Sequence, residues 1–248
     1  MEPVQSFAKA DVFKSCVAVR TFSKEMVVQR NMLIRVVSGG MRLTLADRTV
    51  TLNAGDTIFF PKNGLCKVVK YPENGVPYQA VSITLTQHSG TSDIRILTAH
   101  PLLDSLFDSM LPYFRLSDEL PEDISKIKTQ EAISILKALG IEPSKEEPPK
   151  IDLKDFMEHN FMFNLPIERF GYLTGRSLTT FKRDFKKTYN TTPQRWLTQK
   201  RLALAHDLLQ TKKPTDVYLD AGFENLSHFS YAYKKQYGHS PRHENLPQ

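Results

Sequence analysis

The chain has no long hydrophobic run and no recognisable targeting segment. No apolar stretch among its 248 residues approaches the roughly 18 consecutive apolar residues that a transmembrane helix needs. Residues 1–4 do not begin a basic region followed by an apolar core, as a secretory signal would. These absences argue against a membrane protein with spanning helices. They predict a cytoplasmic protein that has no membrane partner.

Cysteine is scarce as well. The two cysteines, Cys16 and Cys66, provide neither a disulfide framework nor the spacing of a metal site. Free cysteine usually behaves as a small hydrophobic residue. We therefore expect both side chains to be buried.

The residues that catalysis requires are also few. Two histidines, His88 and His100, precede residue 150, whereas a catalytic metal takes about three protein ligands. A single histidine is more often a surface or satisfied core residue. The chain has no Gly-x-Ser-x-Gly motif, no Cys/His pair and no phosphate-binding glycine loop. The sequence thus predicts no enzyme activity, no metal and no cofactor.

A repeat near the C-terminal end is the most informative pattern that is present. The pattern Phe-x-Arg-x-Phe-Lys-Lys-x-x-Asn-x-x-Pro at residues 181–193 recurs as Phe-x-Tyr-x-Tyr-Lys-Lys-x-x-Gly-x-x-Pro at residues 229–241. In each copy the aromatic residues share one helical face and the lysines close the helix. Asn190 or Gly238 then supplies a left-handed residue. One structural unit is therefore built twice.

A short helix and a turn precede each copy. The first helix is expected at 167–173, with a turn through Gly175 and Ser177 as the N-cap of the next helix. The second is expected at 217–221, followed by a longer turn at 222–225. This arrangement is typical of a helix-turn-helix that reads DNA. A helical hairpin that binds nothing is the alternative, and two copies with basic ends make it a poor explanation.

One long helix is expected between the units. Thr192 fits an N-cap and Pro193 the first helical position, and an apolar stripe continues to Gln210. The helix would span roughly 27 Å at about 1.5 Å per residue, close to the roughly 34 Å between successive major grooves. The formal net charge of +6 is concentrated here, because residues 176–213 hold ten basic and two acidic residues. A charge run is usually a solvated surface, but this one follows the helices that would lie on phosphates.

The region from 153 to 241 resembles the AraC/XylS family of transcription regulators. The similarity is carried mainly by residues 177–187, 193–197 and 238–241. It implies an all-helical DNA-binding domain of two helix-turn-helix units joined by a long helix, with RNA polymerase as a partner. The departures from the family pattern are Gly171 and Tyr218 in place of Ala, Asn190 in place of Gly, and Tyr231 in place of a common Arg.

The N-terminal region is expected to be rich in β-structure. Residues 1 to about 88 contain short alternating segments at 41–45, 49–52, 57–61 and 81–85 with turns between them. Such segments predict a β-sandwich or small barrel. The run at 52–61 also resembles a turn of the cupin-like sensor domain found in many AraC-type regulators.

The expected fold class is therefore α+β with two domains. A cupin-like regulatory and dimerisation domain would occupy 1–140, a proline-rich linker 141–150, and the all-α DNA-binding domain 151–248. Apolar faces within 94–111 and 130–139 predict helices. Whether both pack on their own barrel or one forms a homodimer interface stays open.

The DNA-contacting candidates lie on the polar side of the two second helices, opposite the buried face. Those expected to read bases are Thr179, Thr180, Lys182, Arg183, Asn225, Ser227, His228, Ser230 and Tyr231. Those expected to contact phosphates are Arg176, Lys186, Lys187, Lys234 and Lys235.

These features predict a sequence-specific regulator of transcription that binds double-stranded DNA as a homodimer, and an activator rather than a repressor. Its N-terminal domain would sense a small-molecule effector, or it would respond to a protein partner with no small ligand. A cupin-type enzyme fused to a DNA-binding domain is the remote alternative, because the residues for catalysis are missing.

Overall fold

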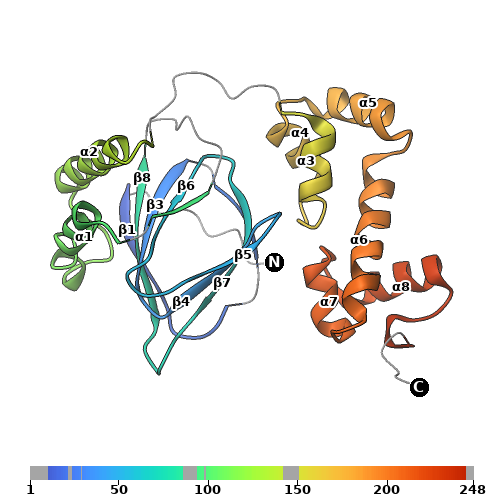
Figure 1. The fold of residues 1–248 in the computed structure, drawn as a ribbon, viewed down its shortest axis with the longest axis horizontal. Helices are drawn as coiled ribbons and strands as arrows, with labels where there is room; N and C mark the ends of the chain where they lie inside the picture. The colour runs from blue at the N-terminus through green and yellow to red at the C-terminus, as the bar shows by residue number, and fades with distance from the viewer. Residues whose placement is uncertain are drawn as a thin grey trace. The chain divides into compact units, whose positions relative to one another are not determined.

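The computed structural model describes residues 11–21, 24–28, 30–85, 94–97, 99–141 and 151–243. The chain divides into two compact units, Met1–Pro148 and Pro149–Gln248 (Figure 1). Of the proposed linker, residues 142–150 lie outside the described residues, as does His88.

The N-terminal unit is built on two antiparallel sheets (Figure 1). The five-stranded sheet has the order β1-β8-β3-β6-β9, and the four-stranded sheet has the order β2-β7-β4-β5. The strands are β1 (Val12–Val17), β2 (Lys24–Val27), β3 (Asn31–Ser38), β4 (Gly40–Thr44), β5 (Thr49–Leu52), β6 (Thr57–Phe60), β7 (Leu65–Tyr71), β8 (Tyr78–Leu85) and β9 (Arg95–Leu97). One hydrophobic core joins both sheets, and it contains Ile34, Met41 and Phe60. The α+β fold class is thus confirmed.

The alternating segments form the strands that their pattern predicts. In β4 the side chains of Met41 and Leu43 are buried and that of Arg42 is exposed. The hairpin to β5 closes with a hydrogen bond from Leu45 N to Arg48 O of 2.8 Å. Alternation fixes which side chains enter the core, because successive residues of a strand point to opposite faces.

Helices cover the outer face of the five-stranded sheet. They are α1 (Pro101–Asp108), the 3-10 turn η1 (Tyr113–Arg115) and α2 (Glu122–Ala138). Leu106 and Leu136 belong to the same hydrophobic core as Leu33 of β3 and Phe59 of β6. The two helical regions therefore pack on their own sheet, which is one of the alternatives considered above.

The expected helix from 94 to 111 is wrong in its first part. Residues 95–97 form β9, in which Ile96 pairs with Ile58 at the edge of the sheet. The helix begins at Pro101, which suits a first helical position, and His100 Nδ1 accepts a hydrogen bond from Leu102 N at 3.3 Å. Leu102, in the apolar stretch that predicts this helix, is 50% exposed. The second expected helix, 130–139, starts earlier, at Glu122.

The two cysteines differ. Cys66 is buried in the core between the sheets, and this burial raises the pKa of its thiol to about 12. Cys16 is exposed, so its expected burial is wrong. It lies in β1, the edge strand of its sheet.

The C-terminal unit is all-helical. Its elements are α3 (Leu153–Asn160), α4 (Ile167–Leu173), α5 (Leu178–Tyr189), α6 (Pro193–Leu209), α7 (Pro214–Asp220), α8 (Leu226–Tyr237) and the 3-10 turn η2 (Pro241–His243). The long connecting helix is confirmed as α6, capped by Thr192. The second short helix starts at Pro214 rather than Val217, because proline suits the first helical position.

Helix α6 contributes to both cores of this unit. Trp196 and Leu197 pack with Phe181 and Phe185 of the first helix-turn-helix. Further along α6, Leu202, Ala205 and Leu209 pack with Phe229 and Tyr233 of the second. The first unit is α4–α5 and the second is α7–α8, and α6 runs from one to the other (Figure 1).

The segment between α3 and α4 is fixed to α6 by a buried arginine. Arg201 donates from Nε to Phe161 O at 2.8 Å and from Nη2 to Phe163 O at 2.7 Å. Gly222, in the turn of the second unit, has a φ of +90°, and a Cβ there would lie 2.4 Å from Met162 O. Glycine is required at this position, because the backbone of the second unit passes directly against that segment.

Candidate DNA interface

Helices α5 and α8 start and end in matching ways. The side chain of Ser177 accepts a hydrogen bond from Thr180 N at 3.3 Å, and that of Asn225 accepts one from His228 N at 2.8 Å. Each helix ends in a left-handed residue, Asn190 with φ 52° and Gly238 with φ 85°. The predicted N-cap Ser177 and the two predicted left-handed residues are thus confirmed, and the N-cap Asn225 makes α8 the equivalent of α5 in the second helix-turn-helix unit.

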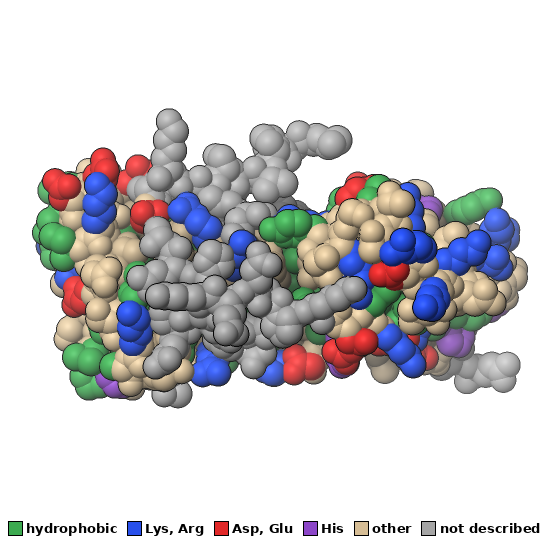
Figure 2. Space-filling view, turned by 90° about the horizontal axis from the view of Figure 1, so that it is seen from above, with side chains coloured by type: hydrophobic (Ala, Val, Ile, Leu, Met, Phe, Trp, Pro, Cys, Tyr) green, Lys and Arg blue, Asp and Glu red, His purple; other side chains and the backbone are tan. Residues whose placement is uncertain are grey.

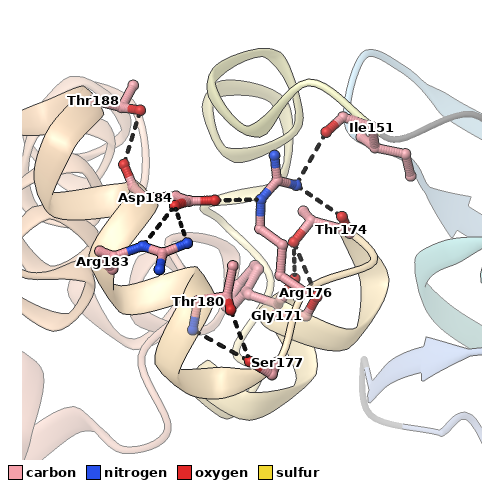
Figure 3. A network of polar contacts seen from close by, with 10 residues as sticks. Ile151, Gly171, Thr174, Arg176, Ser177, Thr180, Arg183, Asp184 and Thr188 are labelled. Atoms are coloured by element: carbon pink, nitrogen blue, oxygen red, sulfur yellow. Dashed lines mark hydrogen bonds and ion pairs between the residues drawn. The ribbon is translucent and has the colours of Figure 1, made fainter.

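In the first unit the base-reading candidates lie on the solvent side of α5. Thr179 and Lys182 are exposed, and the side chain of Arg183 is 75% exposed. Thr180 is half-buried, and its hydroxyl accepts a hydrogen bond from Ser177 Oγ at 3.0 Å, so it is part of the helix cap (Figure 3). Thr179 and Lys182 remain free to face a ligand, whereas the exposed guanidinium of Arg183 is hydrogen-bonded to Asp184.

In the second unit the candidates include no lysine and no arginine. Asn225, Ser227 and His228 are exposed, and Tyr231 is 70% exposed. Asn225 already uses its side-chain oxygen for the cap, and His228 stands edge-on to Phe223 with ring centroids 5.8 Å apart. The last candidate, Ser230, is half-buried.

Two lysine pairs close the recognition helices. These residues are Lys186, Lys187, Lys234 and Lys235, and all four side chains are exposed. None of them takes part in an ion pair within the part of the chain that the structure describes. On the face shown in Figure 2, Lys and Arg side chains are spread over the helical unit with Asp and Glu side chains among them. Such lysines can contact phosphates as point charges.

Arg176 does not fit the phosphate role expected of it. Its side chain is 9% exposed, and Nη1 donates to Thr174 O at 2.7 Å and to Ile151 O at 3.1 Å. Its Nε donates to Asp184 Oδ2 at 3.4 Å (Figure 3). These contacts turn the guanidinium into the domain, so Arg176 ties α5 to the start of α3 instead of reaching outward.

Asp184 is a member of the site that the sequence analysis does not predict. Its carboxylate accepts hydrogen bonds from both Arg176 and Arg183 (Figure 3). Partial burial alone would raise the pKa of Asp184, but these hydrogen bonds and charges lower it below its usual value. The available signal was a single acidic residue within a strongly basic recognition helix.

Known proteins resemble this chain over its helical unit or over a longer part of it. A family model described as a helix-turn-helix domain matches residues 173–244. The thermoregulatory protein LcrF of Yersinia pestis is 26% identical over 174 residues, which are 64% of this chain and 62% of that protein. The transcriptional regulator ExsA of Pseudomonas aeruginosa is 32% identical over 91 residues, 36% of this chain and 33% of that protein. The chain thus spans less than two thirds of the length of these relatives.

Among solved structures, ToxT from Vibrio cholerae matches 95% of this chain and 96% of its own, with 11% identity and a TM-score of 0.39. Within the described ranges no helix is long and apolar enough to cross a membrane. The same ranges contain no cluster of three or more His, Cys, Asp or Glu residues that could hold a metal ion.

Proposed function

We propose that this chain, whose C-terminal unit is a helix-turn-helix domain of the AraC/XylS type, is a sequence-specific DNA-binding regulator that activates transcription. The observation that carries the proposal is the pair of capped recognition helices, α5 and α8, carried on one helix, α6. A relative, VirF of Yersinia enterocolitica, is described as a virulence regulon transcriptional activator. We propose the same class of activity here, with RNA polymerase as the partner.

The exposed residues of α5 and α8 support a division of labour. Long cationic side chains such as Lys182 and Arg183 can reach guanine edges in a major groove. The lysines at the ends of both helices are placed for phosphates, where they add affinity without sequence preference. Helix N-termini add backbone N–H groups that suit an anionic backbone.

For the N-terminal unit we propose a regulatory role and homodimerisation. Two packed cores, one between the sheets and one beneath α1 and α2, support a folded unit suited to either task. A small-molecule effector and a protein partner are alternative inputs. A structure of this unit with a bound ligand would favour the first. We propose no enzyme activity and no membrane partner, and we place the protein in the cytoplasm.

The proposal is tested by selection from duplex DNA with a randomised core, using the full chain, followed by anisotropy titrations at several salt concentrations. We expect a preferred sequence and an affinity that falls steeply with salt. Lys186→Ala should weaken binding to all duplexes alike and reduce the salt slope by about one. Lys137→Ala, an exposed lysine of α2, serves as the matched control. Binding with no preference for any sequence would contradict the proposal.

A further inference from the structure

The recognition helix of the first unit carries a carboxylate that is held between two guanidinium groups. Asp184 has a side chain that is 28% exposed, and it faces Arg176 on one side and Arg183 on the other (Figure 3). A carboxylate on a helix that approaches DNA would repel phosphates. This one is neutralised by arginines and lies where it can influence a residue that reads bases.

One arginine fixes the carboxylate in place. The side chain of Arg176 is 9% exposed, and its Nη1 donates to the backbone oxygens of Thr174 and Ile151. Its Nε is then directed at Oδ2 of Asp184. Because Arg176 is itself tied to the backbone at two points, Asp184 is held at a defined position on α5, and its second oxygen, Oδ1, is directed outward.

The second oxygen of Asp184, Oδ1, restrains the exposed side chain of Arg183. Arg183 donates from Nε at 3.3 Å and from Nη2 at 3.4 Å, both to Oδ1 of Asp184. Neighbouring residues of a helix do not face each other, so this contact requires the long stem of Arg183 to bend around the helix. The Nε side of the guanidinium is then occupied. The end that carries Nη1 and an N–H of Nη2 is left for a ligand.

We infer that Asp184 is a positioning residue that sets the base preference of the first unit, by holding Arg183 with its two terminal nitrogens toward a base edge. Those nitrogens can make a bidentate contact with O6 and N7 of guanine. Without the carboxylate, the flexible side chain of Arg183 can turn to a phosphate. That contact would keep the affinity of the chain for DNA but would remove the preference for guanine. This inference rests on the proposed function and names a specificity determinant within it.

The second unit offers a natural comparison, because the same positions there lack the charges. Across the repeat, Arg183 corresponds to Tyr231 and Asp184 corresponds to Ala232, while Arg176 corresponds to Glu224. Ala232 is partly buried against the apolar core of the second unit. The restraint is therefore a property of the first unit and not of the shared fold.

The test uses the full chain and the duplex obtained by selection with the wild type. Asp184→Asn keeps the shape of the side chain and removes its charge. We expect it to retain or raise affinity for unrelated duplexes, and to lower discrimination at the guanine contacted by the first unit about fivefold or more. Asp207→Asn, an exposed acid on α6, makes the same change in net charge and should leave discrimination unchanged.

The decisive readout is the base-by-base preference, which a purely structural role would not alter selectively. Equal preference in Asp184→Asn and wild type, with both folded by circular dichroism, would overturn the inference while leaving the proposed function intact. A wild type that selects no sequence would contradict the proposed function, and this inference with it.

A transplant of the three charges provides a second test that does not depend on the folding of Asp184→Asn. Tyr231→Arg alone should raise affinity for all duplexes. Combining it with Glu224→Arg and Ala232→Asp should restrict the new arginine and create a guanine preference under the second unit. If the triple variant is folded and binds as unselectively as Tyr231→Arg, the inference is wrong.

Discussion

The two helix-turn-helix units share backbone geometry but differ in the chemistry that holds them. In the first, the core is aromatic and apolar, and the charged contacts of Arg176 with Asp184 lie at its edge. In the second, polar groups enter the core itself. Tyr233 is fully buried with its hydroxyl 2.7 Å from His206 Nδ1, and the ring of His206 stacks on Tyr237 at 4.9 Å. A repeated fold therefore constrains caps and aromatic positions but leaves the polar contacts free to diverge.

The largest effect is expected from removing equivalent core aromatics. Phe181→Ala and Phe229→Ala each delete a ring that is fully buried, and each should lower the free energy of unfolding by about 3–5 kcal/mol. Because α6 belongs to both cores, we expect the units to unfold together. Trp196 is the single tryptophan and lies in the first core, so its fluorescence during urea unfolding reports on that core. An unchanged Trp196 midpoint in Phe229→Ala would show that the two units unfold separately.

The second effect concerns DNA reading. Arg183→Ala should relax base preference under the first unit and lose about 1–3 kcal/mol of discrimination. Tyr231→Ala should cost less, because a tyrosine hydroxyl offers a single hydrogen bond. Anisotropy titrations against a series of single base-pair substitutions compare the two. A stricter half-site under α8, or a greater loss in Tyr231→Ala, would contradict this expected order and would indicate that Ser227 and His228 contribute more to base recognition.

A smaller effect on stability is expected from removing one tyrosine hydroxyl in each unit. Tyr233→Phe removes the hydroxyl that is hydrogen-bonded to His206 and should destabilise the chain by about 1 kcal/mol, since a partly buried hydrogen bond is lost. Tyr189→Phe in the first unit loses a more exposed hydrogen bond, to Lys154 O at 3.2 Å, and should cost less. Thermal unfolding of both variants provides the measurement. Equal losses of stability would mean that the hydrogen bond between Tyr233 and His206 contributes no more than the one made by Tyr189.

The smallest effects are expected at the left-handed caps. Gly238→Ala should destabilise by about 1 kcal/mol, because an alanine side chain is strained at a φ of 85°. Asn190→Gly should be neutral or stabilise by a few tenths of a kcal/mol, since asparagine is tolerated there and glycine is unstrained. Urea midpoints distinguish the two outcomes. A destabilising Asn190→Gly would assign the asparagine side chain a role beyond its backbone conformation.

Local features of the helical unit could be predicted from the sequence because neighbouring residues determine them. Ser177 and Thr192 cap helices through bonds to backbone groups three residues away. Pro193 starts α6, and Asn190 ends α5, by backbone preference alone. The pattern of short strands in the N-terminal unit is local in the same sense, as alternation is read within four or five residues.

The features that were missed depend on distant partners. Arg176 looks like a phosphate ligand in sequence, and it turns inward because the carbonyl of Ile151, far along the chain, accepts its N–H. Residues 95–97 look helical, but they pair with β6 and become an edge strand. Burial of Cys16 could not be judged, because it depends on the place of β1 at the edge of its sheet.

The anchoring of α6 has a consequence for the spacing of operator half-sites. Arg201 of α6 and Gly222 of the second unit both lie against the backbone of 161–163, and we expect these contacts to keep α5 and α8 at a fixed separation. One extra base pair between half-sites would rotate the second by about 35° around the DNA axis and move it by about 3.4 Å. A rigid reader cannot follow that rotation. We therefore expect the chain to require two half-sites in one helical phase, because α6 sets the separation between α5 and α8.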